Sequence, residues 1–111
     1  MGHALRRGDL YRVRHPSDDP KKARVFVVVS RNALLGTQFS TVICAPVLSH
    51  GEGLSTQVQL GPDQGLKHVS WLTCDGLTSI EKSRLTDYLA TLPAPKLLEL
   101  NRALRAALDL G

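Results

Sequence analysis

The chain has 111 residues, of which 42% are hydrophobic and 22% are charged, and its formal net charge is +4. These values are typical of a soluble globular protein with one core, so we expect a single domain over residues 1–111. No apolar run approaches the roughly 20 residues that span a bilayer, and residues 1–8 lack the apolar segment of a signal peptide. We therefore expect a cytoplasmic protein that does not contact a membrane.

The basic residues are concentrated near the N-terminus. Residues 1–31 contain eight of the 14 Lys and Arg residues but only three of the ten Asp and Glu residues. Such a cluster suits a polyanion such as RNA, or an acidic partner peptide. A surface that merely keeps the protein soluble explains the same surplus.

Six short segments have the β-branched content or the alternation of apolar and polar residues that is typical of strands. In chain order they are residues 10–14, 25–30, 41–45, 56–60, 69–74 and 77–80. Pro46 is expected to end the third strand, and a turn-rich loop over residues 15–22 separates the first two. Residues 81–85 are expected to form a turn or a single helical turn.

The C-terminal part predicts an amphipathic helix of about four turns, with Pro93 and Pro95 at its start. Its apolar residues recur three or four positions apart: Leu97, Leu98, Leu100, Leu104, Ala107 and Leu108. We expect this helix to pack on the sheet or to form a subunit interface. Many short antiparallel strands followed by one helix predict an α+β domain built on a small curled sheet or barrel.

Several kinds of site have no signature in the sequence. There is no Walker A loop, dinucleotide-binding glycine motif, H-E-x-x-H or G-x-S-x-G. No spacing of Cys, His or carboxylates resembles a zinc or calcium site, so we predict no metal and no cofactor. Cys44 and Cys74 lie in predicted strands, and buried free thiols are expected there rather than a disulfide.

Arg24 stands directly before the apolar run Val25–Val29, which predicts a buried strand. An arginine at the start of a rigid strand is held in place, as a residue that handles phosphate must be. Cleavage of RNA needs no metal if the 2′-hydroxyl attacks and the protein stabilises the added charge on phosphorus. An ordinary solvated arginine beside a core strand is the alternative interpretation of Arg24.

Other residues near these segments are candidates for the same chemistry. His15 and His50 lie in predicted loops, where imidazoles can move protons near neutral pH, and Ser49 can donate a hydrogen bond to phosphate. The alternative interpretation is that His15 and His50 are ordinary surface histidines and that Ser49 is a turn residue after Pro46. The candidates for RNA binding are Arg14, His15, Lys21, Lys22 and His50.

Four segments together resemble the MazF/PemK group of toxins from toxin–antitoxin systems. They are Arg7–Tyr11 (RGDLY), Arg24–Ser30 (RVFVVVS), Thr41–Ser49 (TVICAPVLS) and the stretch from Gly65 to Leu85, which ends in SIEKSRL. Each motif alone is weak, but their order and spacing are specific. The resemblance extends from about Arg7 to Leu110.

The resemblance implies an SH3-like, barrel-shaped antiparallel core with a C-terminal helix, as in CcdB, PemK and MazF proteins. It also implies a homodimer, metal-independent and sequence-selective cleavage of single-stranded RNA, and neutralisation by an acidic antitoxin. The catalytic arginine of the family falls on Arg24. The family's catalytic threonine falls on Leu48, which cannot form a hydrogen bond, and the adjacent Ser49 is the candidate replacement.

A non-nucleolytic poison of DNA gyrase, resembling CcdB, is the alternative function, because the missing threonine favours it. CcdB-type activity is associated with a Trp-Gly-Ile ending on the last helix, whereas this chain ends in Leu108–Gly111 (LDLG).

Overall fold

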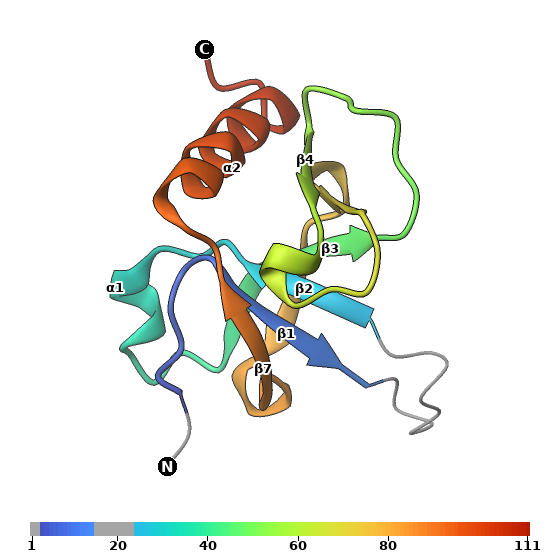
Figure 1. Cartoon of the computed structure of the whole chain (residues 1–111). Helices are drawn as coiled ribbons and strands as arrows, with labels where there is room; N and C mark the ends of the chain where they lie inside the picture. Colours follow the sequence, from blue (N-terminus) through green and yellow to red (C-terminus); the bar gives the residue numbers. More distant parts are fainter. Residues whose placement is uncertain (1–2, 15–23) are drawn as a thin grey trace.

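The computed structural model describes residues 3–14 and 24–111, and within these ranges seven strands form one antiparallel sheet (Figure 1). The strands are β1 (Asp9–Val13), β2 (Arg24–Val28), β3 (Thr41–Leu48), β4 (Gln57–Leu60), β5 (Ser70–Thr73), β6 (Thr78–Glu81) and β7 (Asp87–Thr91). Their order across the sheet is β4–β5–β3–β2–β1–β7, and β6 pairs with the first half of β3.

Two α-helices accompany the sheet. The short α1 (Asn32–Leu35) follows β2, and α2 (Ala94–Ala107) ends the fold, with a proline in its first turn as predicted. Residues of α2 three or four positions apart contact the core, whereas Leu98 lies off that stripe and is 58% exposed. Leu108, which was expected on the apolar face, follows the last residue of the helix and is 53% exposed. Neither helix has the length and apolar character that crossing a membrane requires, among the residues described.

The sheet separates two apolar clusters, because successive residues of a strand point to opposite faces. In β2, Val27 belongs to the cluster under α2, which also includes Leu72 and Leu100. The next residue, Val28, belongs to the second cluster with Leu35 of α1. The predicted curled antiparallel sheet with a C-terminal helix is therefore confirmed.

Pro46 does not end β3, contrary to the prediction. It pairs with Phe26 of β2 and lies inside a strand that continues to Leu48. On the other side of β3, pairing with β6 stops at Cys44 and pairing with β5 begins at Val47, so no ladder partner needs the missing N–H of Pro46. A Cβ built at Gly76 would lie 2.9 Å from Pro46 Cγ, so the 3₁₀ turn there packs directly on the proline ring.

The strand β7 was not among those expected from the sequence. This edge strand pairs only with β1, is interrupted by a register shift at Leu10/Tyr11, and has no fully buried residue. Gly65, between β4 and β5, lies against Leu89 of β7, where a Cβ would be 3.6 Å from the Leu89 carbonyl oxygen. The two edges of the sheet therefore approach each other in a half-barrel. The predicted single helical turn is present at Lys82–Arg84.

Both cysteines are buried and free, as predicted. Cys74 belongs to the cluster under α2 and Cys44 to the opposite cluster, so the sheet separates them. Burial raises the pKa of Cys44 to about 12 and, together with nearby Asp75, raises the pKa of Cys74 to about 11. Both groups are therefore neutral thiols near pH 7.

Candidate functional site

The start of β2 and the end of β3 meet in one pocket with a volume of about 340 Å³. The antiparallel pairing of Val25 with Val47 brings these two strand ends together. The pocket is lined by three of the predicted site residues, Arg24, Ser49 and His50. The remaining lining residues are Val25, Val47, Leu48, Leu66 and Ser70.

Arg24 is the first residue of β2, and its side chain is exposed. Val13 of β1 is its partner on one side, so the main chain at this position is held by the sheet. Within residues 3–14 and 24–111, no carboxylate or carbonyl group binds the Arg24 guanidinium. Its planar set of donors is therefore open to an anion from the pocket.

Ser49 is the first residue beyond β3, and the chain bends there. In a regular strand, the side chains of Leu48 and Ser49 would point to opposite faces of the sheet. Because Ser49 lies beyond the strand, its hydroxyl can share the pocket with Leu48. The side chain of Ser49 is exposed and forms no hydrogen bond with any of the residues described. Leu48 is half-buried and contributes an apolar wall.

Arg14, another predicted RNA-binding residue, does not line this pocket. Arg14 lies on the β7 side of β1, in a separate pocket of about 210 Å³ shared with Arg12, Arg84 and Asp87. Arg84 Nη2 donates a hydrogen bond of 2.9 Å to the carbonyl oxygen of Arg14, which joins the end of β1 to the turn before β7. His15, Lys21 and Lys22 lie outside the described residues.

Leu66 and Ser70 line the pocket but were not predicted. They are brought there by β5, which pairs with β3 through Val47 and Leu72. A pairing between segments more than 20 residues apart leaves no local signal in the sequence, apart from the inclusion of both residues in the stretch that resembles the MazF/PemK group.

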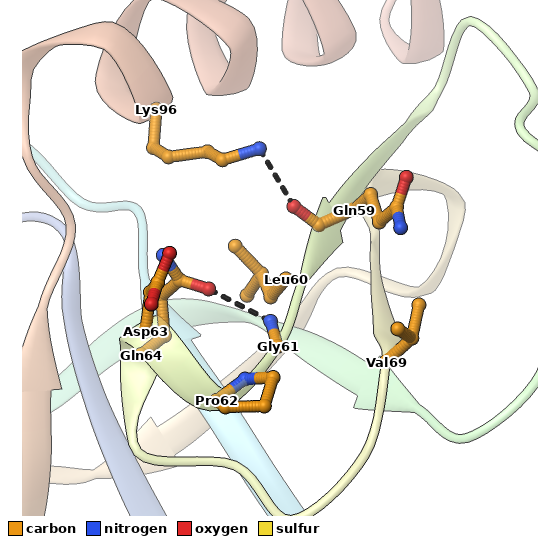
Figure 2. Close-up of a pocket in the computed structure, with 8 residues that line it drawn as sticks. All are labelled: Gln59, Leu60, Gly61, Pro62, Asp63, Gln64, Val69 and Lys96. Carbon is orange, nitrogen blue, oxygen red and sulfur yellow. Dashed lines mark hydrogen bonds between the residues drawn. The ribbon is translucent and has the colours of Figure 1, made fainter.

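A second pocket, of about 310 Å³, lies between β4, the turn after it and α2 (Figure 2). Here the polar groups bind one another: Lys96 Nζ donates to the Gln59 carbonyl oxygen at 2.9 Å, and Gly61 N donates to Gln64 Oε1 at 2.7 Å. These bonds occupy outward-facing groups along the free edge of β4. None of the predicted site residues lines this pocket.

A buried polar cluster lies at the start of β1. Asp9 is fully buried, and its carboxylate accepts hydrogen bonds from Arg6 N at 2.8 Å and from Thr91 Oγ1 at 2.7 Å. His3 Nε2 lies 2.9 Å from Asp9 Oδ2, and the His3 ring stacks on Tyr88. These contacts hold the buried carboxylate within the fold, so the cluster has the character of a structural element.

Comparison with known families decides which group the chain belongs to. Residues 6–108 match the family described as "PemK-like, MazF-like toxin of type II toxin-antitoxin system". The chain belongs to this family. Among curated proteins, none is similar enough to the chain to count as a match.

Solved structures support the same assignment. An endoribonuclease from a mycobacterial species is 26% identical, with a TM-score of 0.79 over 99% of this chain and 96% of that one. An endoribonuclease in complex with its cognate antitoxin, also from a mycobacterial species, is 27% identical, with a TM-score of 0.81 over 97% and 98% of the two chains. Mycobacterium tuberculosis toxin MazF-mt6 is 24% identical and shares the fold, with a TM-score of 0.80 over 93% and 98%.

Proposed function

We propose that this MazF-like toxin is an endoribonuclease that cleaves single-stranded RNA without a metal ion, with Arg24, Ser49 and His50 as its catalytic residues. The observation that carries the proposal is the shared pocket. It combines the Arg24 guanidinium, which no described residue binds, with the hydroxyl of Ser49 and the imidazole of His50. Two of the similar solved structures are named as endoribonucleases.

The reaction we propose begins with attack of an RNA 2′-oxygen on the adjacent phosphorus, while His50 accepts the hydroxyl proton. Arg24 neutralises the charge that builds up on the non-bridging oxygens of the phosphorane, and the Ser49 hydroxyl donates a hydrogen bond to one of them. The bond from phosphorus to the 5′-oxygen then breaks, a water molecule supplies the proton that this oxygen takes up, and His50 passes its own proton to the solvent. The products are a 2′,3′-cyclic phosphate and a 5′-hydroxyl.

Leu48 occupies the position at which the sequence resemblance places the family's catalytic threonine. Its apolar side chain lines the pocket but cannot donate a hydrogen bond to phosphate. Because the chain bends directly after β3, Ser49 offers the nearest hydroxyl. We therefore assign the role of the missing threonine to Ser49.

We also propose that the toxin acts as a homodimer and is neutralised by an acidic antitoxin. A carboxylate-rich segment that covers Arg24 would compete directly with an RNA phosphate for the guanidinium. Leu98 on α2 and Leu108 directly after it are exposed leucines that offer apolar area for contact between subunits. Light scattering of the purified chain, alone and with its antitoxin, tests both assemblies.

The decisive experiment incubates the purified protein with a long single-stranded RNA in excess EDTA. We expect discrete fragments with 5′-hydroxyl ends, which disappear in Arg24→Ala and persist in Arg102→Ala, a control that removes an exposed arginine from α2. Intact RNA combined with trapping of gyrase on DNA would replace the proposal with the CcdB-like alternative. Cleavage by Arg24→Ala at the wild-type rate would remove Arg24 from the mechanism.

A further inference from the structure

Trp71, the only tryptophan of the chain, lies one strand away from the candidate site. It is half-buried on β5, where it pairs with Leu48 of β3 and with Gln59 of β4. Paired residues of neighbouring strands have their side chains on the same face, so the indole lies beside the Leu48 side chain. Directly after Leu48, Ser49 and His50 leave the sheet.

The loop that follows β3 crosses the indole at a glycine. A Cβ built at Gly51 would overlap Trp71 Cγ and would lie 2.6 Å from Cδ2, a separation that no real side chain shows. A Cβ at Gly53 would lie 3.9 Å from Cη2, at the other end of the ring system. The main chain from 51 to 53 therefore runs along the indole, and only glycine permits the approach at 51.

A second contact fixes the same loop just beyond the indole. Gln57 Oε1 accepts hydrogen bonds of 3.2 Å from both Glu52 N and Leu54 N. The other end of that carboxamide, Gln57 Nε2, donates to Thr73 Oγ1 of β5 at 3.3 Å. The loop is therefore attached to β5 twice, through the Trp71 ring and through Gln57.

We propose that Trp71 is a positioning residue for RNA cleavage: its indole supports Gly51 and thereby fixes Ser49 and His50 beside Arg24. Only two residues separate Leu48 in the sheet from Gly51 on the ring. One residue spans at most about 3.6 Å, so this short connection has little freedom once both ends are fixed. The inference rests on the proposed function for its reaction, whereas its structural part is measurable without any activity.

The test compares four variants in steady-state cleavage of single-stranded RNA. Gly51→Ala forces the loop off the ring, and Trp71→Leu removes the flat surface. For both we expect kcat to fall by about tenfold to a hundredfold, because small displacements of catalytic groups have effects of this size. The change in KM is expected to be smaller, because Arg24 remains in place. Trp71→Phe keeps a flat ring and should restore most of kcat.

Gly36→Ala is the matched control. Gly36 does not line the pocket, and a Cβ added there would meet no neighbouring group within 4 Å. We expect this variant to keep the wild-type kcat.

A structural readout accompanies the kinetics. Protons held over an indole are shifted upfield by its ring current, so the Gly51 α-protons should show this NMR shift in the wild type. We expect Trp71→Leu to abolish the shift and Trp71→Phe to retain part of it. If Trp71→Leu does not fold, Gly51→Ala and the wild-type spectrum still provide the test.

The outcomes separate this inference from the proposed function. If the wild type does not cleave RNA, or if Arg24→Ala cleaves it equally well, the proposed function fails and the positioning role fails with it. If cleavage depends on Arg24 but Gly51→Ala and Trp71→Leu keep the wild-type kcat, only the positioning role is overturned. Gly51 α-protons without an upfield shift in the wild type would also overturn it.

Discussion

Two strands at the centre of the sheet begin with charged residues, and the two charges have opposite environments. Asp9 opens β1 and is completely buried, with hydrogen bonds from Arg6 N and Thr91 Oγ1 and with His3 at 2.9 Å. Arg24 opens β2, is exposed, and its guanidinium has no hydrogen-bond or ion-pair partner among residues 3–14 and 24–111.

The difference separates a charge that serves the fold from one that is available to a ligand. A buried charge is tolerated only when its hydrogen-bonding capacity is satisfied, so the partners of Asp9 are part of the native structure. An exposed guanidinium on a rigid strand costs the fold little and keeps its donors free. Substitutions at the two positions should therefore affect different properties of the protein.

The largest expected effect is on activity in Arg24→Ala. Loss of the guanidinium should lower kcat/KM for RNA about a thousandfold, or about 4 kcal/mol of barrier, because no other described donor replaces it. The unfolding free energy should stay within about 0.5 kcal/mol of wild type, since the side chain is exposed. Urea titration beside the cleavage assay checks both, and a strongly destabilised Arg24→Ala would contradict the comparison.

The reverse pattern is expected for Asp9→Ala, which should lower the unfolding free energy by about 3 kcal/mol. The change removes a fully buried carboxylate, and with it the acceptor of two part-buried hydrogen bonds, from the Thr91 hydroxyl and from the Arg6 amide. Asp87→Ala is the matched control: its ion pair with Arg12 is 3.7 Å long and exposed, and its loss should cost less than 1 kcal/mol. Equal decreases in the unfolding free energy of the two variants would show that the buried Asp9 cluster stabilises the fold no more than an exposed ion pair does.

A smaller effect is expected for the hydroxyl of the pocket. Ser49→Ala should reduce the cleavage rate at least tenfold, which corresponds to about 1.4 kcal/mol of barrier, while Ser79→Ala on β6 should leave it unchanged. An unaltered rate in Ser49→Ala would remove that residue from the mechanism. Leu48→Thr complements the test, because a gain in cleavage would identify the missing threonine as the limiting group.

A final effect concerns pH and two buried groups of the cluster opposite α2, Tyr11 and Cys44. Burial, reinforced by Asp9, raises the pKa of Tyr11 from 10.0 to about 12, and burial raises the pKa of Cys44 from 9.0 to about 12. Each group stays protonated in the native state while the unfolded chain already loses its proton. The unfolding free energy should therefore be constant up to about pH 9 and fall between pH 9 and 12. Urea titrations at pH 8 and pH 10.5 check this, and equal stability at the two values would contradict it.

Most of the fold could be predicted because its segments have strong periodic patterns. The apolar run after Arg24 and the three- and four-residue spacing in α2 both indicated the correct elements. The strand β7 could not be predicted, because a half-exposed edge strand with an irregular register has no clear alternation. The prediction that Pro46 ends β3 was wrong. Pro46 is tolerated inside the strand because β6 pairs with β3 only up to Cys44 and β5 only from Val47, and local sequence does not reveal this pairing.

The candidate site was predictable in its residues but not in its arrangement. Arg24, Ser49 and His50 were selected from local patterns, and the structure brings them to one pocket, whereas Arg14 lies in another. Their catalytic and binding roles remain predictions. The contact of Gly51 with Trp71 has no signal in the sequence, because it depends on the pairing of β5 with β3, which are far apart along the chain.

The proposed function requires that the Arg24 guanidinium receives the phosphate of a bound RNA strand. NMR of arginine side chains, with the Arg24 signal assigned through Arg24→Lys, tests this directly when a single-stranded 2′-deoxy oligonucleotide, which cannot be cleaved, is added. We predict that the Arg24 Nε signal shifts and that its proton becomes protected from exchange with water. Binding that moves the signals of Arg12 and Arg84 but leaves Arg24 unchanged would contradict the account.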